Sequence, residues 1–254
     1  MAYQFLKAAS EAGVVTITLD RPPLNVLNIE MMEELIVALK WADEQPESLL
    51  AITGEGKAFS AGVDIADHTP DKVAMMIDVF DRLFLTMSEI EKPIIALVNG
   101  AALGGGYEIV LFCDLVVASE KAKLGQPEVK VGVFPPIACY ILPRLLSWPL
   151  AMEIILSGDT IDAARAEQIG LVNKVLPADS FEAGAEDFLK RFSELSPAVL
   201  AFTKKAAKAG IGKDFSEGIK AIDQIYLYEL MKTDDAVEGL QAFMEKRKPV
   251  WRGK

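Results

Sequence analysis

A series of short apolar runs, each followed by turn residues, most constrains what this chain can fold into. The first run alternates apolar and polar residues and stops at Asp20-Arg21-Pro22-Pro23, as a strand followed by a turn does. Most of the later runs are almost wholly apolar, which is typical of strands buried on both faces of a sheet. The runs cover residues 14–19, 49–53, 94–98, 115–118 and 171–176. We therefore expect an α/β fold in which helices cover both faces of the sheet.

Helical periodicity fills the intervals between these runs. Apolar residues recur at helical spacing in residues 31–41, and residues 71–91 and 105–112 have a helical pattern too. After residue 180 only helical patterns remain, in residues 181–195, 197–209, 214–232 and 234–247. Ser196-Pro197 suits a helix start, with serine as the cap and proline in the first turn. We divide the chain into an α/β core at residues 1–195, which holds the functional site, and a helical C-terminal region at residues 196–254 for packing and oligomerisation.

Composition and charge exclude several classes of protein. With 254 residues, 51% hydrophobic and 25% charged, the chain has the balance of a globular protein and suits one large α/β unit. The net charge of −11 argues against nucleic acid as a partner, because the summed field repels a polyanion. The single histidine, His68, excludes a multi-histidine metal site, and Cys113 and Cys139 lack zinc spacing. We expect no signal peptide and no membrane span, and hence a cytoplasmic protein.

The segment with the most chemical information is glycine-rich and joins an apolar run to a helix. It reads Asn99-Gly100-Ala101-Ala102-Leu103-Gly104-Gly105-Gly106-Tyr107-Glu108. It lacks the Lys-Ser/Thr of a P-loop and the spacing of a dinucleotide fingerprint. Glycines let the backbone approach a ligand, and a helix start offers free N–H groups, so an oxyanion site is the remaining reading. Residues 57–64, also rich in small side chains, are the candidate for its second donor. Tight packing turns would explain both segments equally well.

Two carboxylates favour the chemical interpretation. Glu108 lies in the first turn of the helix that the glycines open, and Glu128 follows the run at 115–118. If both carboxyls converge in an apolar cleft, the pKa of one rises, and the pair can supply a base and an acid for adding water to an activated double bond. The alternative is that Glu108 interacts with the helix dipole and Glu128 is solvated.

Together with further motifs, these segments resemble the enoyl-CoA hydratase/isomerase (crotonase) family, and the resemblance covers nearly the whole chain. The segments that carry the resemblance are Arg21-Pro22-Pro23-Leu24-Asn25-Val26-Leu27, Ala58-Phe59-Ser60-Ala61-Gly62-Val63-Asp64-Ile65, Asn99 to Glu108, Cys113-Asp114, Gly125-Gln126-Pro127-Glu128 and Lys248-Pro249-Val250-Trp251. The resemblance implies a crotonase-like spiral of ββα units with a helical C-terminal region. It also implies a homotrimer or a dimer of trimers, no metal, and no cofactor, since coenzyme A is part of the acyl-CoA substrate.

The family pattern also assigns the site. It gives the oxyanion hole to the backbone N–H groups of Val63 and Gly105, and the acid and base roles to Glu108 and Glu128. It places the substrate and CoA contacts at Val26, Ala61, Gly62, Asp64, Ile65 and Gly104. We assign Glu108 as the base that activates water and Glu128 as the proton donor, although the sequence does not fix this division.

These residues favour a hydratase acting on a conjugated α,β-unsaturated acyl-CoA thioester. An isomerase that shifts the double bond without water, and a noncatalytic acyl-CoA-binding protein, remain alternatives. Residues 133–139, with Pro135-Pro136, and residues 66–71 resemble the cyclic dienoyl-CoA hydratases of anaerobic aromatic degradation, such as cyclohexa-1,5-diene-1-carbonyl-CoA hydratases. The sequence leaves the acyl group, stereochemistry and direction open. His68 is either an exposed loop residue before a helix capped by Thr69 or a substrate contact. Lys57, Lys204, Lys205 and Lys208 are plausible contacts for the CoA phosphates.

Overall fold

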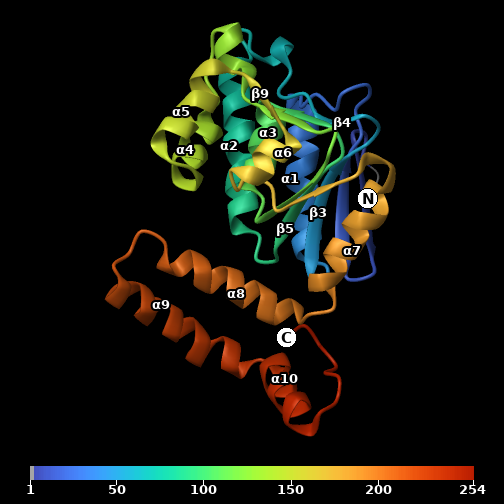
Figure 1. Cartoon of the computed structure of the whole chain (residues 1–254), viewed down its shortest axis with the longest axis vertical. Coiled ribbons are helices and arrows are strands. Elements are labelled where there is room, and N and C mark those ends of the chain that lie inside the picture. The colour runs from blue at the N-terminus through green and yellow to red at the C-terminus, as the bar shows by residue number, and fades with distance from the viewer. Residues whose placement is uncertain (1–2) are drawn as a thin grey trace.

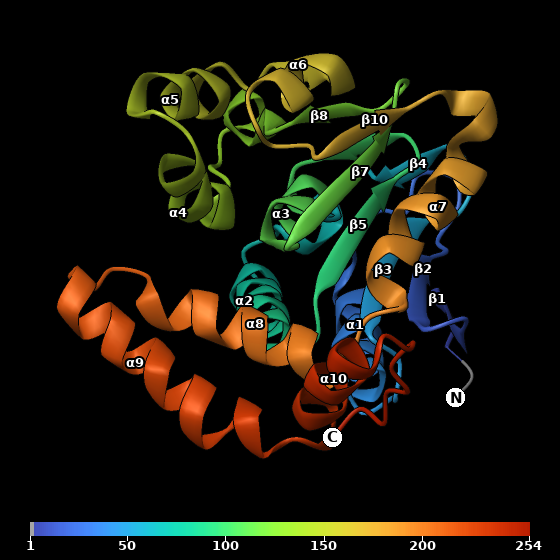
Figure 2. The ribbon, with the colours of Figure 1, turned by 60° about the horizontal axis from the view of Figure 1, so that its bottom comes forward.

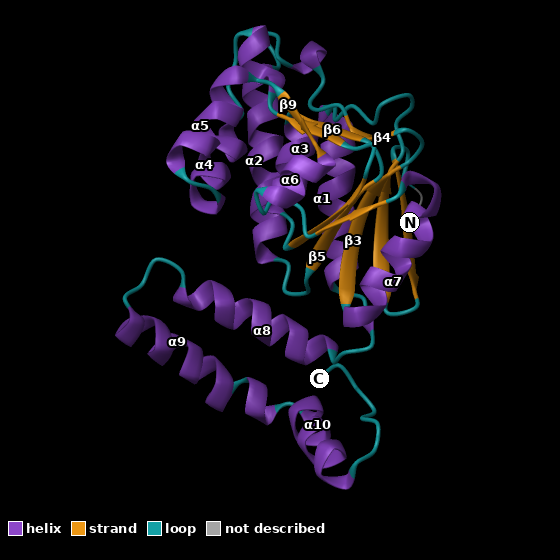
Figure 3. Ribbon diagram, viewed as in Figure 1, coloured by secondary structure: helices purple, strands orange, loops and turns teal. Residues whose placement is uncertain are grey.

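The computed structural model describes residues 3–254 and contains two β-sheets, drawn as orange strands in Figure 3. In the larger sheet, which has the strand order β1-β2-β3-β5-β7-β10, β1 and β2 are antiparallel and the other neighbours are parallel. Its strands are β1 (Leu6–Glu11), β2 (Val14–Leu19), β3 (Leu49–Gly54), β5 (Ile94–Val98), β7 (Leu115–Ser119) and β10 (Lys174–Leu176). The smaller sheet has the order β4-β6-β8-β9. Its strands are β4 (Ala58–Ser60), β6 (Ala101–Leu103), β8 (Lys123–Gly125) and β9 (Thr160–Asp162).

Both faces of the larger sheet are covered, which confirms the predicted α/β fold. On β3, Leu50 and Ile52 belong to the core that includes α1 (Ile29–Asp43), α2 (Val73–Glu89) and α3 (Gly105–Phe112). Leu49 and Ala51 point the other way, into the core formed with α7 (Phe181–Ser193). Figure 1 shows α7 and α1 on opposite sides of the strands. Each fully buried Leu or Ile contributes about 1.5–3 kcal/mol to this packing.

The order of elements matches the spiral of ββα units that the resemblance implies. Strand β3 continues into β4 and then α2, and β5 continues into β6 and then α3. Strand β7 continues into β8, the 3₁₀ helix η2 (Pro127–Val131) and α4 (Pro136–Leu145). The first strands of these three units are parallel neighbours, so their carboxyl ends meet at the border between the two sheets. The predicted site residues follow these strand ends.

The remaining helices complete the α/β part and form the C-terminal region. They are η1 (Ile65–Asp67), α5 (Trp148–Ser157), α6 (Ala163–Gln168), η3 (Ala178–Ser180), α8 (Pro197–Gly210), α9 (Phe215–Tyr228), η4 (Leu230–Lys232) and α10 (Asp234–Glu245). Figures 1 and 2 show α8, α9 and α10 extending away from the sheets. Among residues 3–254, no helix is long and apolar enough to cross a bilayer.

The start of α8 agrees with its sequence prediction. Ser196 is the N-cap, and its hydroxyl accepts a hydrogen bond from Val199 N at 3.1 Å. The same hydroxyl donates to the buried carboxylate of Asp235 at 2.6 Å, which ties α8 to the first turn of α10. The division of the chain into residues 1–195 and 196–254 stays a prediction.

One predicted strand is shorter than expected. Residues 171–176 read as a strand, but only Lys174–Leu176 pairs with β7. Leu171 N donates to Ala166 O at 2.9 Å, so Leu171 closes the end of α6, and its apolar side chain packs in the core. Asn173 then starts the pairing by accepting a bond from Val116 N through its side chain at 2.7 Å.

Candidate active site

The two segments predicted to form the oxyanion hole lie against each other. Val63 follows β4, Gly105 follows β6, and these two strands pair in parallel. A methyl group at Gly105 would lie 2.6 Å from Cγ2 of Val63, and one at Gly62 would lie 3.6 Å from the nitrogen of Gly105. Glycine at both positions therefore permits the close approach of the two backbones.

The N–H groups of Val63 and Gly105 are both free to bind a ligand. Val63 forms an isolated parallel bridge with Leu27, but the bonds of that bridge use its neighbours: Leu27 N donates to Gly62 O and Asp64 N donates to Leu27 O, each at 2.8 Å. Gly105 is the first residue of α3, where an N–H has no acceptor within the helix. Across residues 3–254, no acceptor of the chain binds either N–H.

Gly104 brings a carboxylate next to these amides. Its φ of 50° and ψ of −132° are rarely adopted by other residues. A methyl group at this position would lie only 2.5 Å from Oε1 of Glu128. The carboxylate of Glu128 therefore rests on the backbone of Gly104, one residue before the free N–H of Gly105.

Glu108 is buried beside the first turn of α4. Glu108 is 2% exposed, and its Oε1 accepts a hydrogen bond from Ala138 N at 2.8 Å. Burial raises the pKa of Glu108 to about 8; the N–H of Ala138 opposes this rise, and the negative charge of Glu128 adds to it. The structure thus places the two glutamates close enough for one charge to act on the other.

Glu128 is half-buried on η2, and burial raises its pKa to about 7. Gln126, which is fully buried, orients it: with its amide nitrogen toward the carboxylate, Gln126 donates to the two oxygens at 3.1 and 3.2 Å. The sequence prediction missed Gln126 and Ala138. The only sequence signal for Gln126 was its place in the motif that contains Glu128. No sequence signal distinguishes the Ala138 amide.

Most of the residues predicted to contact CoA lie near Val63 in the folded chain, and their role as CoA contacts stays a prediction. Ala61 N donates to Leu24 O at 2.9 Å, which joins the segment after β4 to the segment that contains Val26. Asp64 caps η1 by accepting a bond from Ala66 N at 3.1 Å. Ile65, the next residue, has an exposed side chain. With Gly104, which lies beside Gly62, the predicted contacts come from three separate stretches of sequence that the structure brings together.

His68 is not the exposed loop residue that one of its two predictions describes, and its role as a substrate contact stays a prediction. It is half-buried, and its Nδ1 lies 3.0 Å from the carbonyl oxygen of Asp64. Thr69 does not cap α2: the helix begins at Val73 with Lys72 as N-cap residue and without a side-chain cap. The reason is a turn in which Lys72 N and Val73 N both donate to the carbonyl oxygen of Thr69, each at 2.9 Å.

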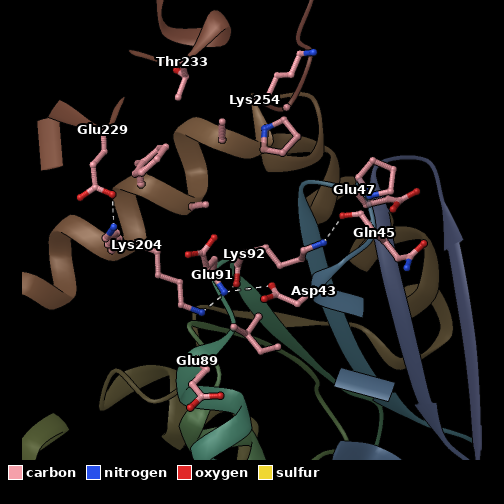
Figure 4. Close-up of a pocket in the computed structure, with 18 of the residues that line it drawn as sticks. Asp43, Gln45, Glu47, Glu89, Glu91, Lys92, Lys204, Glu229, Thr233 and Lys254 are labelled. Carbon is pink, nitrogen blue, oxygen red and sulfur yellow. Dashed lines mark hydrogen bonds and ion pairs between the residues drawn. The ribbon is translucent and has the colours of Figure 1, made fainter. Parts of the chain in front are cut away.

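The lysines of α8 line another cavity, of about 610 Å³, between the core and the C-terminal helices (Figure 4). Lys204, whose side chain is 9% exposed, pairs with Asp114 at 2.6 Å. Lys205 pairs with Glu229, and Lys208 donates to Ser88 O at 3.1 Å. The cavity is lined by residues 88–92, which lead into the amino end of β5, whereas Glu108 and Glu128 lie beyond the carboxyl ends of β5 and β7. Within one chain these lysines therefore do not face the site.

Comparisons with known proteins agree with this architecture. The family model described as enoyl-CoA hydratase/isomerase matches residues 9–254. A probable enoyl-CoA hydratase of Mycobacterium bovis is 36% identical over 98% of each chain. A cyclohexa-1,5-dienecarbonyl-CoA hydratase of Thauera aromatica is 33% identical over 96% of this chain and 95% of its own. The crystal structure of an enoyl-CoA hydratase from Bacillus anthracis has a TM-score of 0.93 and 32% identity, covering 99% of this chain and 100% of that one.

The fold is an α/β spiral of ββα units, and its site combines two free amides with two carboxyls. The chain belongs to the enoyl-CoA hydratase/isomerase family. This membership confirms the predicted family, the crotonase-like fold and the prediction of an enzyme of the hydro-lyase type.

Proposed function

We propose that this protein adds water to a conjugated α,β-unsaturated acyl-CoA thioester. The observation that carries the proposal is the buried Glu108 and the half-buried Glu128 beside the free N–H groups of Val63 and Gly105. Two donors and two carboxyls are the parts that hydration of an enoyl thioester requires.

The two amides activate the substrate. The thioester carbonyl oxygen accepts hydrogen bonds from Val63 N and Gly105 N, which draws electron density from the conjugated alkene. As water attacks the β carbon, negative charge accumulates on that oxygen. One well-placed donor is worth roughly 3–4 kcal/mol toward such a charge. The site needs no change of backbone to provide both donors, because neither N–H is used elsewhere in residues 3–254.

The glutamate pair moves the protons. Because burial raises both pKa values toward neutrality, the pair can hold one proton between its two carboxyls. We assign the reactive form to the one in which the shared proton lies on Glu128: Glu108 then takes a proton from the attacking water, and Glu128 donates its proton to the α carbon as the enolate collapses. The two roles exchange in the reverse reaction, the loss of water.

The finer proposal concerns the acyl group, for which a cyclic dienoyl-CoA is our candidate. Support comes from the 33% identity to the Thauera aromatica enzyme and from the chain between the glutamate contacts. Ala138 binds Glu108, and Pro135-Pro136 precede it at the start of α4, after the exposed Phe134. Two prolines stiffen this apolar stretch, which suits a rigid ring better than a flexible linear chain.

Product mass tests both levels of the proposal. The protein is incubated with a panel of linear enoyl-CoA and cyclic dienoyl-CoA esters, and the mass of each product is measured by mass spectrometry. Hydration adds the mass of one water, and a preference for cyclic esters supports the finer proposal. A preference for linear esters contradicts the ring substrate and keeps the hydratase. A product of unchanged mass with a shifted double bond identifies an isomerase, and binding without any product identifies a noncatalytic protein.

The acid and base assignment has its own test. Glu108→Gln and Glu128→Gln should each lower the hydration rate by about 100-fold or more, since general acid or base catalysis contributes this much. Binding of the CoA ester should change little, because glutamine keeps the shape of each side chain. Near-normal rates in both variants would exclude these residues as acid and base.

We also propose that the chain assembles into a homotrimer or a dimer of trimers. Large apolar side chains of the C-terminal helices are exposed in the single chain: Phe215, Tyr226, Leu227, Leu240, Phe243 and Met244. Exposed apolar area of this extent is typical of surfaces that bind another protein chain.

A further inference from the structure

Two of the three segments predicted to contact CoA are joined by a few backbone hydrogen bonds and not by a strand ladder. Val26 lies on one segment, and Ala61 to Ile65 form the other. The isolated bridge between Leu27 and Val63 supplies two backbone hydrogen bonds and Ala61 N donates a third to Leu24 O, where a strand ladder would supply a longer series. Side chains add to this join: Asn25 Nδ2 donates to Ala58 O at 2.9 Å, and Ser60 Oγ donates to Asn25 O at 2.7 Å. These bonds lie before Val26 and Val63, so the part of the two segments beyond them depends on a further side chain.

Arg21 makes a contact to each segment. Its Nη1 donates to the carbonyl oxygen of Val26 at 2.8 Å, and its Nη2 pairs with Oδ2 of Asp64 at 3.2 Å. The guanidinium also lies over the ring of Phe5, 6.0 Å from the ring centre. A backbone contact completes the arrangement, as Arg21 N donates to Oδ1 of the buried Asn25 at 3.0 Å.

Asp64 passes this constraint on to the chain around the oxyanion hole. While Oδ2 binds Arg21, Oδ1 accepts the bond from Ala66 N that caps η1. The backbone of Asp64 is bonded as well, through its N–H to Leu27 and through its carbonyl oxygen to His68. The residue directly before Asp64 is Val63, whose N–H is one of the two free donors.

We propose that Arg21 is a positioning residue that holds the two CoA-binding segments in register. The inference rests on the proposed function, because that function makes these segments the CoA site. Arginine is required because its planar fork presents two donors at fixed geometry, whereas lysine is a single charged point. The Arg21 and Asp64 side chains are only 29% and 27% exposed, so solvent screens their pairing less than that of a surface ion pair.

A direct contact between Arg21 and a CoA phosphate is the rival explanation. In the structure both terminal nitrogens of Arg21 already bind protein oxygens. The two explanations differ in what they predict for substrates without phosphate groups. A positioning arginine affects every thioester that enters the site, whereas a phosphate contact affects only the CoA ester.

Steady-state kinetics with crotonyl-CoA and crotonyl-pantetheine separate these explanations. We expect Arg21→Ala to raise KM about tenfold for both esters, because charged hydrogen bonds that order the site are lost. We expect kcat to fall less than threefold and the pH profile to keep its shape, since Ala138 and Gln126 still hold the glutamates. Arg21→Lys should restore part of the affinity. Arg82→Ala, which removes an exposed arginine paired with Glu33 and Asp78, is the matched control and should leave KM unchanged.

A double-mutant cycle and hydrogen exchange complete the test. Asp64→Asn and Arg21→Ala should raise KM by amounts that are not additive in the double variant, because the two side chains act as one pair. Amide exchange in residues 61–68 should be faster in Arg21→Ala than in wild type, a result that does not depend on catalysis. An increase in KM for the CoA ester alone, or an unchanged exchange rate, overturns the positioning role. Wild-type protein that neither binds nor hydrates any thioester would instead overturn the proposed function.

Discussion

Single residues in this site are constrained by what lies beside them as much as by their own chemistry. Gly104 shows this most clearly, because its missing Cβ leaves the space that the carboxylate of Glu128 occupies. Its positive φ adds a second reason for glycine. A residue without a side chain thus decides where a predicted catalytic side chain lies.

Gly104→Ala should lower kcat by about 100-fold, since displacing a reacting group by about 1 Å has an effect of that size. The added methyl would lie 2.5 Å from Glu128 Oε1, so the carboxyl must move. Gly170→Ala is the matched control: its φ is +83°, but a methyl there would meet nothing within 4 Å. Both variants should lose stability, and hydration assays should show the loss of activity in Gly104→Ala alone.

The buried Glu108 should make folding stability depend on pH. Its pKa is raised from 4.5 to about 8, mainly by burial, so between these values the folded chain keeps a proton that the unfolded chain has released. Stability should therefore fall as pH rises from about 4.5 to about 8. Glu108→Gln removes this dependence and should be more stable than wild type at pH 8 by about 2–4 kcal/mol.

Denaturant unfolding measured from pH 5 to pH 9 checks this expectation. Glu128→Gln, which removes a less buried carboxyl with a pKa of about 7, should give the same direction of change with a smaller amplitude. Parallel stability curves for wild type and Glu108→Gln would show that the folded and unfolded states bind the same number of protons at this position.

At the scale of elements, the sequence predicted those whose pattern is local. Strand β2 and the start of α8 lie where periodicity and capping residues placed them. Strand β1, whose LKAASE sequence has no β-branched residue, was missed because it is fixed by antiparallel pairing with β2. Helix α4 was missed too, because Pro143 lies inside it, where proline usually breaks a helix.

The same distinction holds for the site. Glu108, Glu128, Val63 and Gly105 lie on motifs that the sequence displays, and the structure brings all four together. Their supporting contacts depend on elements that meet only in the folded chain. The Ala138 amide reaches Glu108 because α4 packs on α3, and no pattern in residues 136–145 indicates this contact.

The join between α8, α10 and the C-terminal segment depends on one carboxylate. Asp235 is fully buried and accepts bonds from the hydroxyl of Ser196 at 2.6 Å, from Arg252 N at 2.6 Å and from Gly253 N at 3.0 Å. Removing it would leave three donors without their acceptor. A buried donor without an acceptor lowers the free energy of unfolding, because its lost hydrogen bonds to water are not replaced.

Asp235→Ala should therefore destabilise the C-terminal region by about 2–4 kcal/mol. Hydrogen exchange in residues 234–254, followed by mass spectrometry, should show the loss locally. The neighbouring Asp234→Ala is the control, because Asp234 is exposed and pairs with Arg252 at 3.5 Å. That surface pair should contribute no more than about 0.5 kcal/mol. Equal exchange in the two variants would mean that Asp235 does not organise this region.

At the scale of the whole molecule, the C-terminal helices leave large apolar side chains uncovered. Phe215 on α9 is 85% exposed and Phe243 on α10 is 84% exposed. In the α/β part, Phe59 and Tyr107 are completely enclosed, whereas Phe134 and Trp148 are exposed. The exposed rings of α9 and α10 suit a C-terminal region that is completed by other copies of the chain.

Phe243→Asp should weaken the proposed assembly and shift the protein toward monomers, because it places a charge on a surface that other copies would cover. Light scattering coupled to size-exclusion chromatography measures the mass directly. Val37→Asp on α1 changes an exposed apolar residue of the α/β part and should keep the wild-type mass. A wild-type protein that is monomeric at every concentration would contradict the proposed assembly.

The stretch between Glu128 and Ala138 is anchored at both ends. One end is Glu128 itself, and the other end is Ala138, whose amide donates to Glu108. Its middle, residues 129–137, carries the exposed Val131, Val133 and Phe134. Exchanging this middle with the equivalent loop of a relative offers protein engineers a way to retune acyl preference while both anchors stay in place.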